Sequence, residues 1–175
     1  NLLNASAAVA AAVNAGVSAE RAVDALSRFE GVKRRMEVKG EVAGTKVIDD
    51  FAHHPTAIEE TIKAVRSKYQ TGRLLAVLEP RSNTMKLGTL KAQLPGSLVQ
   101  ADKVFCYQGP AVQWDTAGAL APLGEKAEEF KDLEALVEDV VSQAEQGDTI
   151  LVMSNGGFGG VHKKLLDGLK SKFGA

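Results

Sequence analysis

Four ionisable side chains lie within six residues, at Asp49, Asp50, His53 and His54. The predicted strand 45–48 precedes them and a helix pattern follows, so they mark the end of a strand and the start of a helix. Carboxylates beside imidazoles are able to ligate a metal, to act as acid and base, or to hold a nucleotide. Adjacent histidines rarely face one ion, which disfavours zinc. Nucleotide binding fits better, because carboxylates accept ribose hydroxyls and helix amino termini favour phosphate; the competing interpretation is helix capping by solvated Asp or His.

A second polar segment, residues 79–84, follows the continuous apolar run 74–78. Its arginine, Arg81, could hold a carboxylate with a bidentate fork, a geometry that lysine matches less well. The alternative is a surface turn built on the proline, serine and asparagine of the same segment. The residues of this segment favour neither interpretation over the other.

A third segment, residues 154–160, reads SNGGFGG and lies between an apolar run and a helix pattern. Its four glycines allow backbone amides to approach an anion closely. The segment matches neither G-x-G-x-x-G nor G-x-x-x-x-G-K-[ST], so it is not a standard dinucleotide loop or a Walker A loop. A glycine-rich turn is weak support for binding when it stands alone.

The elements that must position these segments alternate between strand and helix patterns. Strands are predicted by alternating or continuous apolar residues, and helices by apolar residues at helical spacing. Residues 36–42 and 45–48 are predicted to form a β-hairpin around the turn at 43–44. Further strands are predicted at 74–78, 103–107, 128–130 and 148–153, and helices at 3–15, 18–29, 55–69, 87–94, 133–144 and 161–173.

This alternation predicts an α/β fold with a doubly wound, mostly parallel Rossmann-like sheet and an initial β-hairpin. Ligands gather at the carboxyl ends of the strands in such sheets, where the three polar segments fall. The two helices before the first strand are expected to be the tail of a preceding domain, residues 1–30, and residues 31–175 a second domain. Ala22, Val23, Leu26 and Phe29 are expected to form the apolar face of the second helix.

The bulk composition narrows the class of partner. A formal net charge of −1 gives no electrostatic case for nucleic acid or a membrane surface. No apolar run approaches the length of a membrane span. The single cysteine, Cys106, fits a reducing compartment and is expected to be a buried strand residue. No signal-peptide pattern opens the chain and no methionine begins it, so we expect a fragment of a longer protein.

Five segments together resemble the muramyl (Mur) ligase family, whose members build and rebuild peptidoglycan precursors. Residues 1–5 (NLLNA) are similar to the H-N-x-x-N-A segment that ends the family's central ATPase domain, without its histidine. Residues 29–37 (FEGVKRRME) resemble the linker and arginine that open the carboxy-terminal domain. Residues 49–56 (DDFAHHPT) are similar to the D-[YF]-[AG]-H-x-P block. Residues 79–88 (EPRSNTMKLG) and 153–162 (MSNGGFGGVH) resemble the branch that attaches a whole tripeptide.

The resemblance implies nucleotide-handling residues in the first half of the chain. Asn4 would contact the adenine of ATP, with Asn1 beside it. Arg35 and Asp50 would hold the nucleotide, Asp50 through the ribose, and His53 would lie near the γ-phosphate or the acyl phosphate. Arg34 stays open as the alternative to Arg35. Mg²⁺ is implied as well, with its ligands mainly in the central domain, and no metal ligand is assigned within this chain.

The resemblance also implies the substrates. ATP would activate the carboxylate of UDP-N-acetylmuramate, and the tripeptide L-alanyl-γ-D-glutamyl-meso-diaminopimelate would attack it, in the bacterial cytoplasm. The incoming tripeptide would be received by Arg81, Ser82, Asn83, Ser154, Asn155 and Gly156.

Two alternatives stay open. One is the family member that adds L-alanine alone, and the other is a non-catalytic module that binds a nucleotide or a peptide. No G-K-[ST] loop occurs in the chain, so the fragment alone is expected to be inactive.

Overall fold

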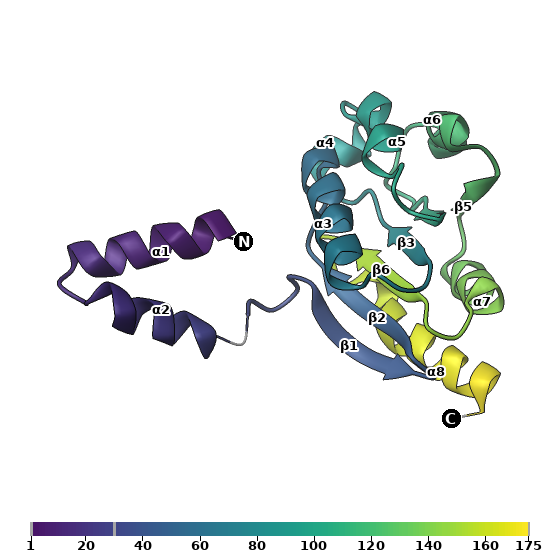
Figure 1. The fold of residues 1–175 in the computed structure, drawn as a ribbon. Coiled ribbons are helices and arrows are strands. Elements are labelled where there is room, and N and C mark those ends of the chain that lie inside the picture. Colours follow the sequence, from purple (N-terminus) through teal and green to yellow (C-terminus); the bar gives the residue numbers. More distant parts are fainter. Residues whose placement is uncertain (1, 30, 175) are drawn as a thin grey trace. The chain divides into compact units, whose positions relative to one another are not determined.

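The structure is a computed structural model and describes residues 2–29 and 31–174. The chain divides into two compact units, residues 1–33 and 34–175. The first unit holds two helices, α1 (Leu2–Asn14) and α2 (Ala19–Ser27) (Figure 1). Ser18 caps α2 by accepting a hydrogen bond from the Arg21 amide. On the expected apolar face of α2, Ala22 is buried while Val23 and Phe29 are exposed, so that face is only partly covered.

The second unit is built on one six-stranded sheet with the order β1-β2-β6-β3-β4-β5. The first pair is antiparallel and every other neighbouring pair is parallel. The predicted doubly wound sheet with an initial hairpin is therefore confirmed. The strands are β1 (Glu37–Val42), β2 (Thr45–Asp50), β3 (Leu74–Leu78), β4 (Lys103–Tyr107), β5 (Ala127–Phe130) and β6 (Thr149–Met153).

Helices cover both faces of this sheet (Figure 1). The α-helices of the second unit are α3 (Pro55–Lys68), α4 (Asn83–Lys86), α5 (Leu94–Ser97), α6 (Thr116–Leu120), α7 (Leu133–Gln143) and α8 (Val161–Phe173). The short 3-10 helices are η1 (Lys91–Gln93), η2 (Ala121–Lys126) and η3 (Phe158–Gly160). Among the described residues, no helix has the length and apolar content that a membrane span requires.

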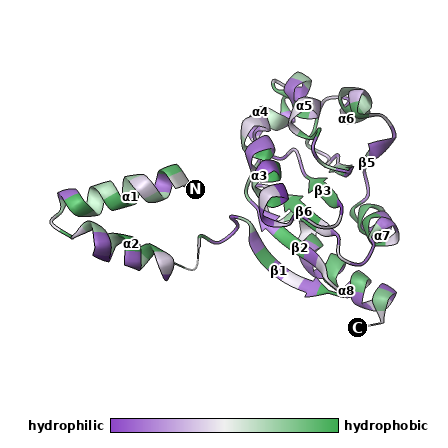
Figure 2. Ribbon diagram, in the orientation of Figure 1, coloured by the Kyte–Doolittle hydropathy of each residue, from purple (hydrophilic) through white to green (hydrophobic). Residues whose placement is uncertain are grey.

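The core has two layers, one on each face of the sheet. Leu74, Ala76 and Leu78 of β3 pack in the layer that includes the buried side of α3, while Leu75 and Val77 pack in the layer beneath α7 and α8. Successive side chains of a strand point to opposite faces, so a strand covered on both faces must be apolar throughout. Figure 2 shows β3 and β6 coloured as hydrophobic along their length, and each is buried at every position.

Cys106 lies inside this core, as expected for a residue of a buried strand. Burial, with a smaller contribution from the charge of Glu129, raises the pKa of its thiol. The thiolate form that a nucleophile requires is therefore disfavoured at neutral pH.

Two differences from the sequence prediction concern the polar segments singled out above. The helix predicted at 87–94 is wrong: α4 ends at Lys86, and only η1 and the start of α5 are helical within that range. Gly88 has a φ of +70°, and the Trp114 indole donates to the carbonyl of Met85 at 2.6 Å, so the indole caps the end of α4. The other difference is that Asp49 and Asp50 belong to β2 rather than following it.

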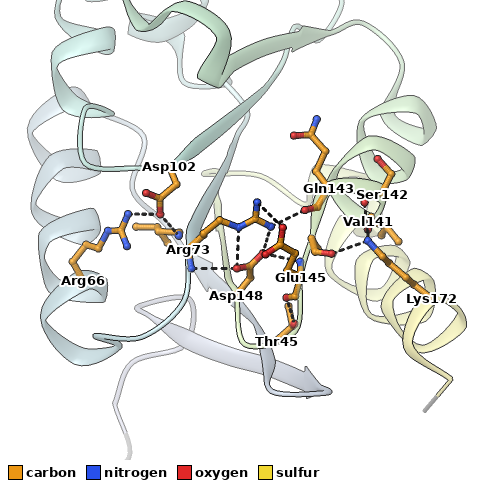
Figure 3. Close-up of polar contacts among 12 residues, drawn as sticks. Thr45, Arg66, Arg73, Asp102, Val141, Ser142, Gln143, Glu145, Asp148 and Lys172 are labelled. Carbon is orange, nitrogen blue, oxygen red and sulfur yellow. Dashed lines mark hydrogen bonds and ion pairs between the residues drawn. The ribbon is translucent and has the colours of Figure 1, made fainter.

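Polar contacts hold the amino ends of the central strands together (Figure 3). The carboxylate of Asp148 receives Arg73 Nη2 at 2.7 Å and Arg73 Nε at 3.3 Å. Asp102 accepts from the Leu74 amide and from Arg66. This end of the sheet is thus occupied by structural ion pairs, which leaves the carboxyl ends of the strands as the place for a site.

Candidate functional site

The three polar segments singled out in the sequence meet at the carboxyl edge of the sheet. In the strand order, β6 lies between β2 and β3. The glycine-rich turn at 154–160, which follows β6, is therefore flanked by residues 51–54 after β2 and residues 79–83 after β3. Parallel strands end at a common edge, which is where doubly wound sheets bind ligands.

The linker before β1 is tied to the end of β2. The Met36 amide donates to Asp50 Oδ2 at 2.9 Å, and the Phe51 amide donates to the Arg34 carbonyl at 2.9 Å. Arg34 and Met36 both adopt a positive φ, of 60° and 51°, a conformation that is uncommon for residues with a side chain. These two residues turn the backbone on either side of Arg35, whose side chain is exposed.

The ring of Phe51 lies among three candidate side chains. The guanidinium carbons of Arg34 and Arg35 lie 5.1 and 5.7 Å from its centroid. The His53 ring meets it edge-on, with centroids 5.3 Å apart and an interplanar angle of 83°. Phe51 had no role in the sequence prediction, and an aromatic residue inside a polar motif is the signal that could have identified it.

The two arginines of the linker have different tasks. Arg34 Nε lies 3.1 Å from Asp49 Oδ2, and its Nη2 donates to the Ser154 carbonyl at 2.5 Å. Arg35 makes no hydrogen bond or ion pair with a side chain of the described residues, and its guanidinium contacts the Phe51 ring. Of the two, Arg35 is the one that is available to a ligand.

The Asp50 side chain is buried and already hydrogen-bonded within the protein. Its residue surface is 3% exposed, and its carboxylate accepts from the amides of Met36 and Ala52 and from the Thr61 hydroxyl. Because Asp50 is buried, a direct contact with a ribose would require the residues that cover its carboxylate to move. In this structure Asp50 holds the linker and the turn after β2 in place.

The two histidines of the motif also differ. His54 caps α3, since its Nδ1 accepts from the Thr56 amide at 3.3 Å, which is the capping interpretation weighed for this motif. His53 Nδ1 lies 2.8 Å from the Phe51 carbonyl. A carbonyl only accepts, so Nδ1 carries the proton and Nε2 is the atom left for a ligand.

Asp49 faces a third histidine that the sequence analysis did not consider. His162 Nε2, in the first turn of α8, lies 3.3 Å from Asp49 Oδ1, but neither atom has a hydrogen bond of good geometry. Burial is the main cause that lowers the pKa of His162; Arg34 and Lys39 lower it too, against the attraction of Asp49. The neutral imidazole is therefore favoured, and Arg34 is the charged partner of Asp49.

On the peptide side of the edge, Arg81 is half exposed and packs against the glycine-rich turn. A Cβ built on Gly156 would lie 2.4 Å from Arg81 Cδ and 2.6 Å from Nε and Nη1. Only glycine allows the guanidinium this approach. Arg81 Nη1 also lies 3.9 Å from Glu79 Oε1.

The other residues expected to receive the peptide are placed unevenly. Asn83 is exposed, whereas the Ser82 hydroxyl caps α4 by accepting from the Met85 amide. Ser154 is 1% exposed, so its expected direct contact with the peptide does not fit the structure: its hydroxyl is already used inside the fold. The Asn155 side-chain oxygen is buried without a hydrogen-bond partner among the described residues.

A cavity of about 220 Å³ opens beside Arg81. It joins the segment after β3 to the segment after β4, which had no predicted role. Its cationic side chains are Arg81 and Lys86, and Lys86 was not among the predicted site residues. The lining residues are Glu79, Pro80, Arg81, Lys86, Gly109, Pro110, Ala111 and Val112.

The first unit contains the two asparagines that were expected at the adenine. Asn4 is exposed on α1, and Asn1 lies outside the described residues. Within residues 2–29 and 31–174, no group of three or more His, Cys, Asp or Glu side chains is arranged to hold a metal ion.

Known proteins share sequence with this chain over most of its length. The family described as "Mur ligase, glutamate ligase domain" matches residues 34–156. UDP-N-acetylmuramate–L-alanyl-gamma-D-glutamyl-meso-2,6-diaminoheptandioate ligase of Escherichia coli (strain K12) is 49% identical over 173 residues, which cover 98% of this chain and 38% of that protein. UDP-N-acetylmuramate–L-alanine ligase of Acidothermus cellulolyticus is 35% identical over 166 residues, covering 90% of this chain and 35% of that protein.

A solved structure is similar to this chain in both sequence and fold. The murein peptide ligase of Psychrobacter arcticus 273-4 shares 40% sequence identity with this chain at a TM-score of 0.75, covering 95% of this chain and 36% of that one. The chain thus spans well under half the length of each of these three relatives.

Proposed function

This chain belongs to the Mur ligase family, and on that premise we propose that it is the carboxy-terminal part of an ATP-dependent ligase. The ligase joins UDP-N-acetylmuramate to the tripeptide L-alanyl-γ-D-glutamyl-meso-diaminopimelate, a reaction of peptidoglycan recycling. The observation that carries the proposal is the 49% identity over 98% of the chain to a relative named for that reaction. The cationic cavity beside Arg81 supports the choice of peptide.

The proposed reaction has two steps. A carboxylate oxygen of the muramate attacks the γ-phosphorus of ATP, the bond to ADP breaks, and an acyl phosphate forms. The amine nitrogen of the tripeptide then attacks the acyl carbon, loses a proton, and displaces inorganic phosphate. Both steps build negative charge on oxygen, so donors fixed near those oxygens lower the barrier.

We assign the nucleotide-side roles to Arg35 and His53. Arg35 is directed outward by the linker and is exposed beside the Phe51 ring, so its guanidinium is free to meet phosphate oxygens. His53 offers Nε2, which donates to a phosphate oxygen when the ring is protonated. Asp50 fixes both by holding residues 36 and 52. Asn4 and Asn1 are assigned to the adenine.

The family also uses Mg²⁺, which neutralises phosphate charge when it is bound. The described residues of this chain do not form a cluster suited to that ion. Its ligands are therefore assigned to the central domain, to which residues 1–30 also belong in this proposal.

On the peptide side, the tripeptide carries several carboxylates, and the cavity presents cations to receive them. Arg81 offers a bidentate fork and Lys86 a point charge at the same cavity. Asn83 is exposed at the start of α4, and Gly156 allows Arg81 its approach. L-alanine alone has one carboxylate and would leave part of this charge unused, which favours the tripeptide over the alanine-adding alternative.

The test is an assay of the full-length protein that contains this chain. We expect amide formation from ATP, UDP-N-acetylmuramate and the tripeptide. With L-alanine in place of the tripeptide, kcat/KM should be lower by a factor of about 100 or more, because the ion pairs to the missing carboxylates are lost. Product formed from L-alanine alone would contradict the proposal. ATP binding without either product would instead support a non-catalytic module. The isolated chain should be inactive in each assay, because it has no G-K-[ST] loop.

A further inference from the structure

A continuous chain of polar contacts crosses three neighbouring strands beneath the candidate site. It begins at Arg81 on the peptide side, passes through Glu79 after β3 and Ser154 after β6, and ends at Arg34 and Asp49 beside the nucleotide side. The successive atoms are Arg81 Nη1 to Glu79 Oε1 at 3.9 Å, Glu79 Oε2 to Ser154 Oγ at 2.6 Å, Ser154 O to Arg34 Nη2 at 2.5 Å, and Arg34 Nε to Asp49 Oδ2 at 3.1 Å.

Glu79 links the peptide side to the middle of this chain. Its side chain is 11% exposed, so its carboxylate needs partners inside the protein. One oxygen accepts the Ser154 hydroxyl, and the other faces Arg81. The Glu79 amide also donates to the Met153 carbonyl at 3.1 Å, which fixes the residue to β6. The Glu79 carboxylate therefore cannot move without affecting Arg81 and Ser154 together.

Ser154 is the centre of the chain because its backbone and its side chain are both engaged. Its amide donates to the Asp50 carbonyl at 3.2 Å, and its carbonyl accepts from Arg34. Its hydroxyl donates to Glu79 and accepts from the Gly156 amide at 3.0 Å. The position of the glycine-rich turn is thereby linked to the linker on one side and to Glu79 on the other.

We propose that Glu79 and Ser154 are positioning residues that couple the peptide-side guanidinium of Arg81 to the linker that directs Arg35. The proposal rests on the function proposed above. The four charged groups in this series of contacts are two carboxylates and two guanidiniums, so removing one charge leaves the charge of its partner uncompensated. Buried polar networks of this kind respond as a unit rather than as separate pairs. Binding on either side therefore sets the geometry of the other.

Steady-state kinetics of the full-length ligase test this coupling through two substitutions and their combination. Glu79→Gln keeps an oxygen that accepts from Ser154 but removes the charge that faces Arg81. Arg34→Lys keeps the charge beside Asp49 but loses the fork that reaches Ser154. We expect each variant to raise the KM of both the tripeptide and ATP, with a smaller change in kcat. The rise in each KM in the double variant should be about fivefold smaller than the product of the rises in the two single variants.

Glu129→Gln is the matched control. Glu129 has a similar exposure of 15%, accepts a hydroxyl from Thr116 at 2.5 Å, and faces Lys131 at 3.6 Å, yet it belongs to the edge strand β5. Both KM values should stay unchanged in this variant. If Glu79→Gln raised only the peptide KM and Arg34→Lys only the ATP KM, or if their effects simply multiplied, the coupling would be refuted.

Hydrogen exchange of the same full-length protein without substrates separates this proposal from the proposed function. Glu79→Gln should speed exchange in residues 154–160 and also in residues 34–37, and Glu129→Gln should change neither segment. Unchanged exchange in residues 34–37 would overturn the coupling even if ligase activity is found. Faster exchange in both segments would support it even if the ligase uses another peptide.

Discussion

At the scale of single residues, the direction of Arg35 depends on its neighbours. Arg34 and Met36 hold a left-handed backbone conformation that costs a residue with a side chain on the order of 1 kcal/mol. Hydrogen bonds offset this cost, since the Arg34 amide donates to Glu37 at 2.8 Å and the Met36 amide to Asp50 at 2.9 Å. The strained linker therefore places one guanidinium inside the fold and the next one outside it.

Replacing Arg35 should lower turnover without a loss of stability, whereas replacing Arg34 should lower stability. We expect Arg35→Ala to lower kcat of the full-length ligase about 100-fold, as loss of one donor to a developing oxyanion does, and to change the free energy of unfolding by less than about 0.5 kcal/mol. Arg34→Ala should lower the free energy of unfolding by about 3 kcal/mol, because Asp49 stays buried without its partner. Denaturant unfolding and steady-state kinetics measure both. A stable, active Arg35→Ala variant would remove Arg35 from the site.

Two adjacent glycines offer a matched test on the peptide side. A Cβ on Gly156 would collide with the Arg81 side chain, whereas a Cβ on Gly157 would meet nothing within 4 Å, and Gly157 has an ordinary φ of −76°. Gly156→Ala should therefore raise the peptide KM about tenfold, the loss expected for one ion pair of this kind, with the ATP KM less affected. Gly157→Ala should behave as the parent enzyme. Equal effects of the two variants would show that general flexibility of the turn, rather than room for Arg81, is what matters.

At the scale of elements, the two ends of the sheet have different roles. The amino ends of β3 and β6 are closed by Arg73 and Asp148 (Figure 3), while the carboxyl ends carry the candidate site. Asp148 is buried and also accepts from the amides of Arg73 and Glu145. Because this end is held by ion pairs and hydrogen bonds, the loops at the other end can be strained or rich in glycine.

Two carboxylates that contact Arg73 test this division. Asp148→Ala should lower the free energy of unfolding by about 3 kcal/mol, because it leaves buried donors without an acceptor. Glu145→Gln should cost less than about 1 kcal/mol, since the Glu145 side chain is 72% exposed. Chemical denaturation compares the two, and kcat of the full-length ligase should be unchanged in both variants. A large loss of turnover at wild-type stability in Asp148→Ala would place a functional group at the wrong end of the sheet.

At the scale of the whole molecule, positive charge is arranged locally. The chain has a formal net charge of −1, so it offers no general attraction for anions. Selection of phosphate and carboxylate groups therefore depends on the few cations at the carboxyl edge of the sheet, Arg35, Arg81 and Lys86.

The pH dependence of global stability should reveal His162. Its pKa is lowered in the folded chain from an unfolded value of about 6.5. Between these two pKa values the unfolded chain binds a proton that the folded chain does not, so stability falls as the pH drops below about 6.5 and the loss levels off below the folded pKa. His162→Gln should weaken the loss of stability that begins as the pH drops below about 6.5, measured by denaturant unfolding. Asp49, Arg34 and Lys39 face this imidazole, and an unchanged pH slope in the variant would assign the acid sensitivity to other groups.

The sequence predicted most of the architecture because its signals are local. Continuous apolar runs such as Leu74–Leu78 require a strand that is covered on both faces, and the turn at Ala43 and Gly44 requires a hairpin. Local signals failed at residues 87–94, where the predicted helix does not form. The helix before them, α4, is capped at Met85 by the indole of Trp114, which lies 29 positions away in the sequence.

The segments at 49–56, 79–88 and 153–162, together with residues 1–5 and 29–37, indicated the family by their residue types and order, and the first three also indicated the edge of the sheet where the candidate site lies. The tertiary structure alone decided which side chains of that edge are available. It buried Ser154 and engaged Asp50 and Arg34, while it left Arg35 and Arg81 exposed. Side-chain availability depends on hydrogen bonds between residues up to 120 positions apart, and spacing along the chain carries no record of such contacts.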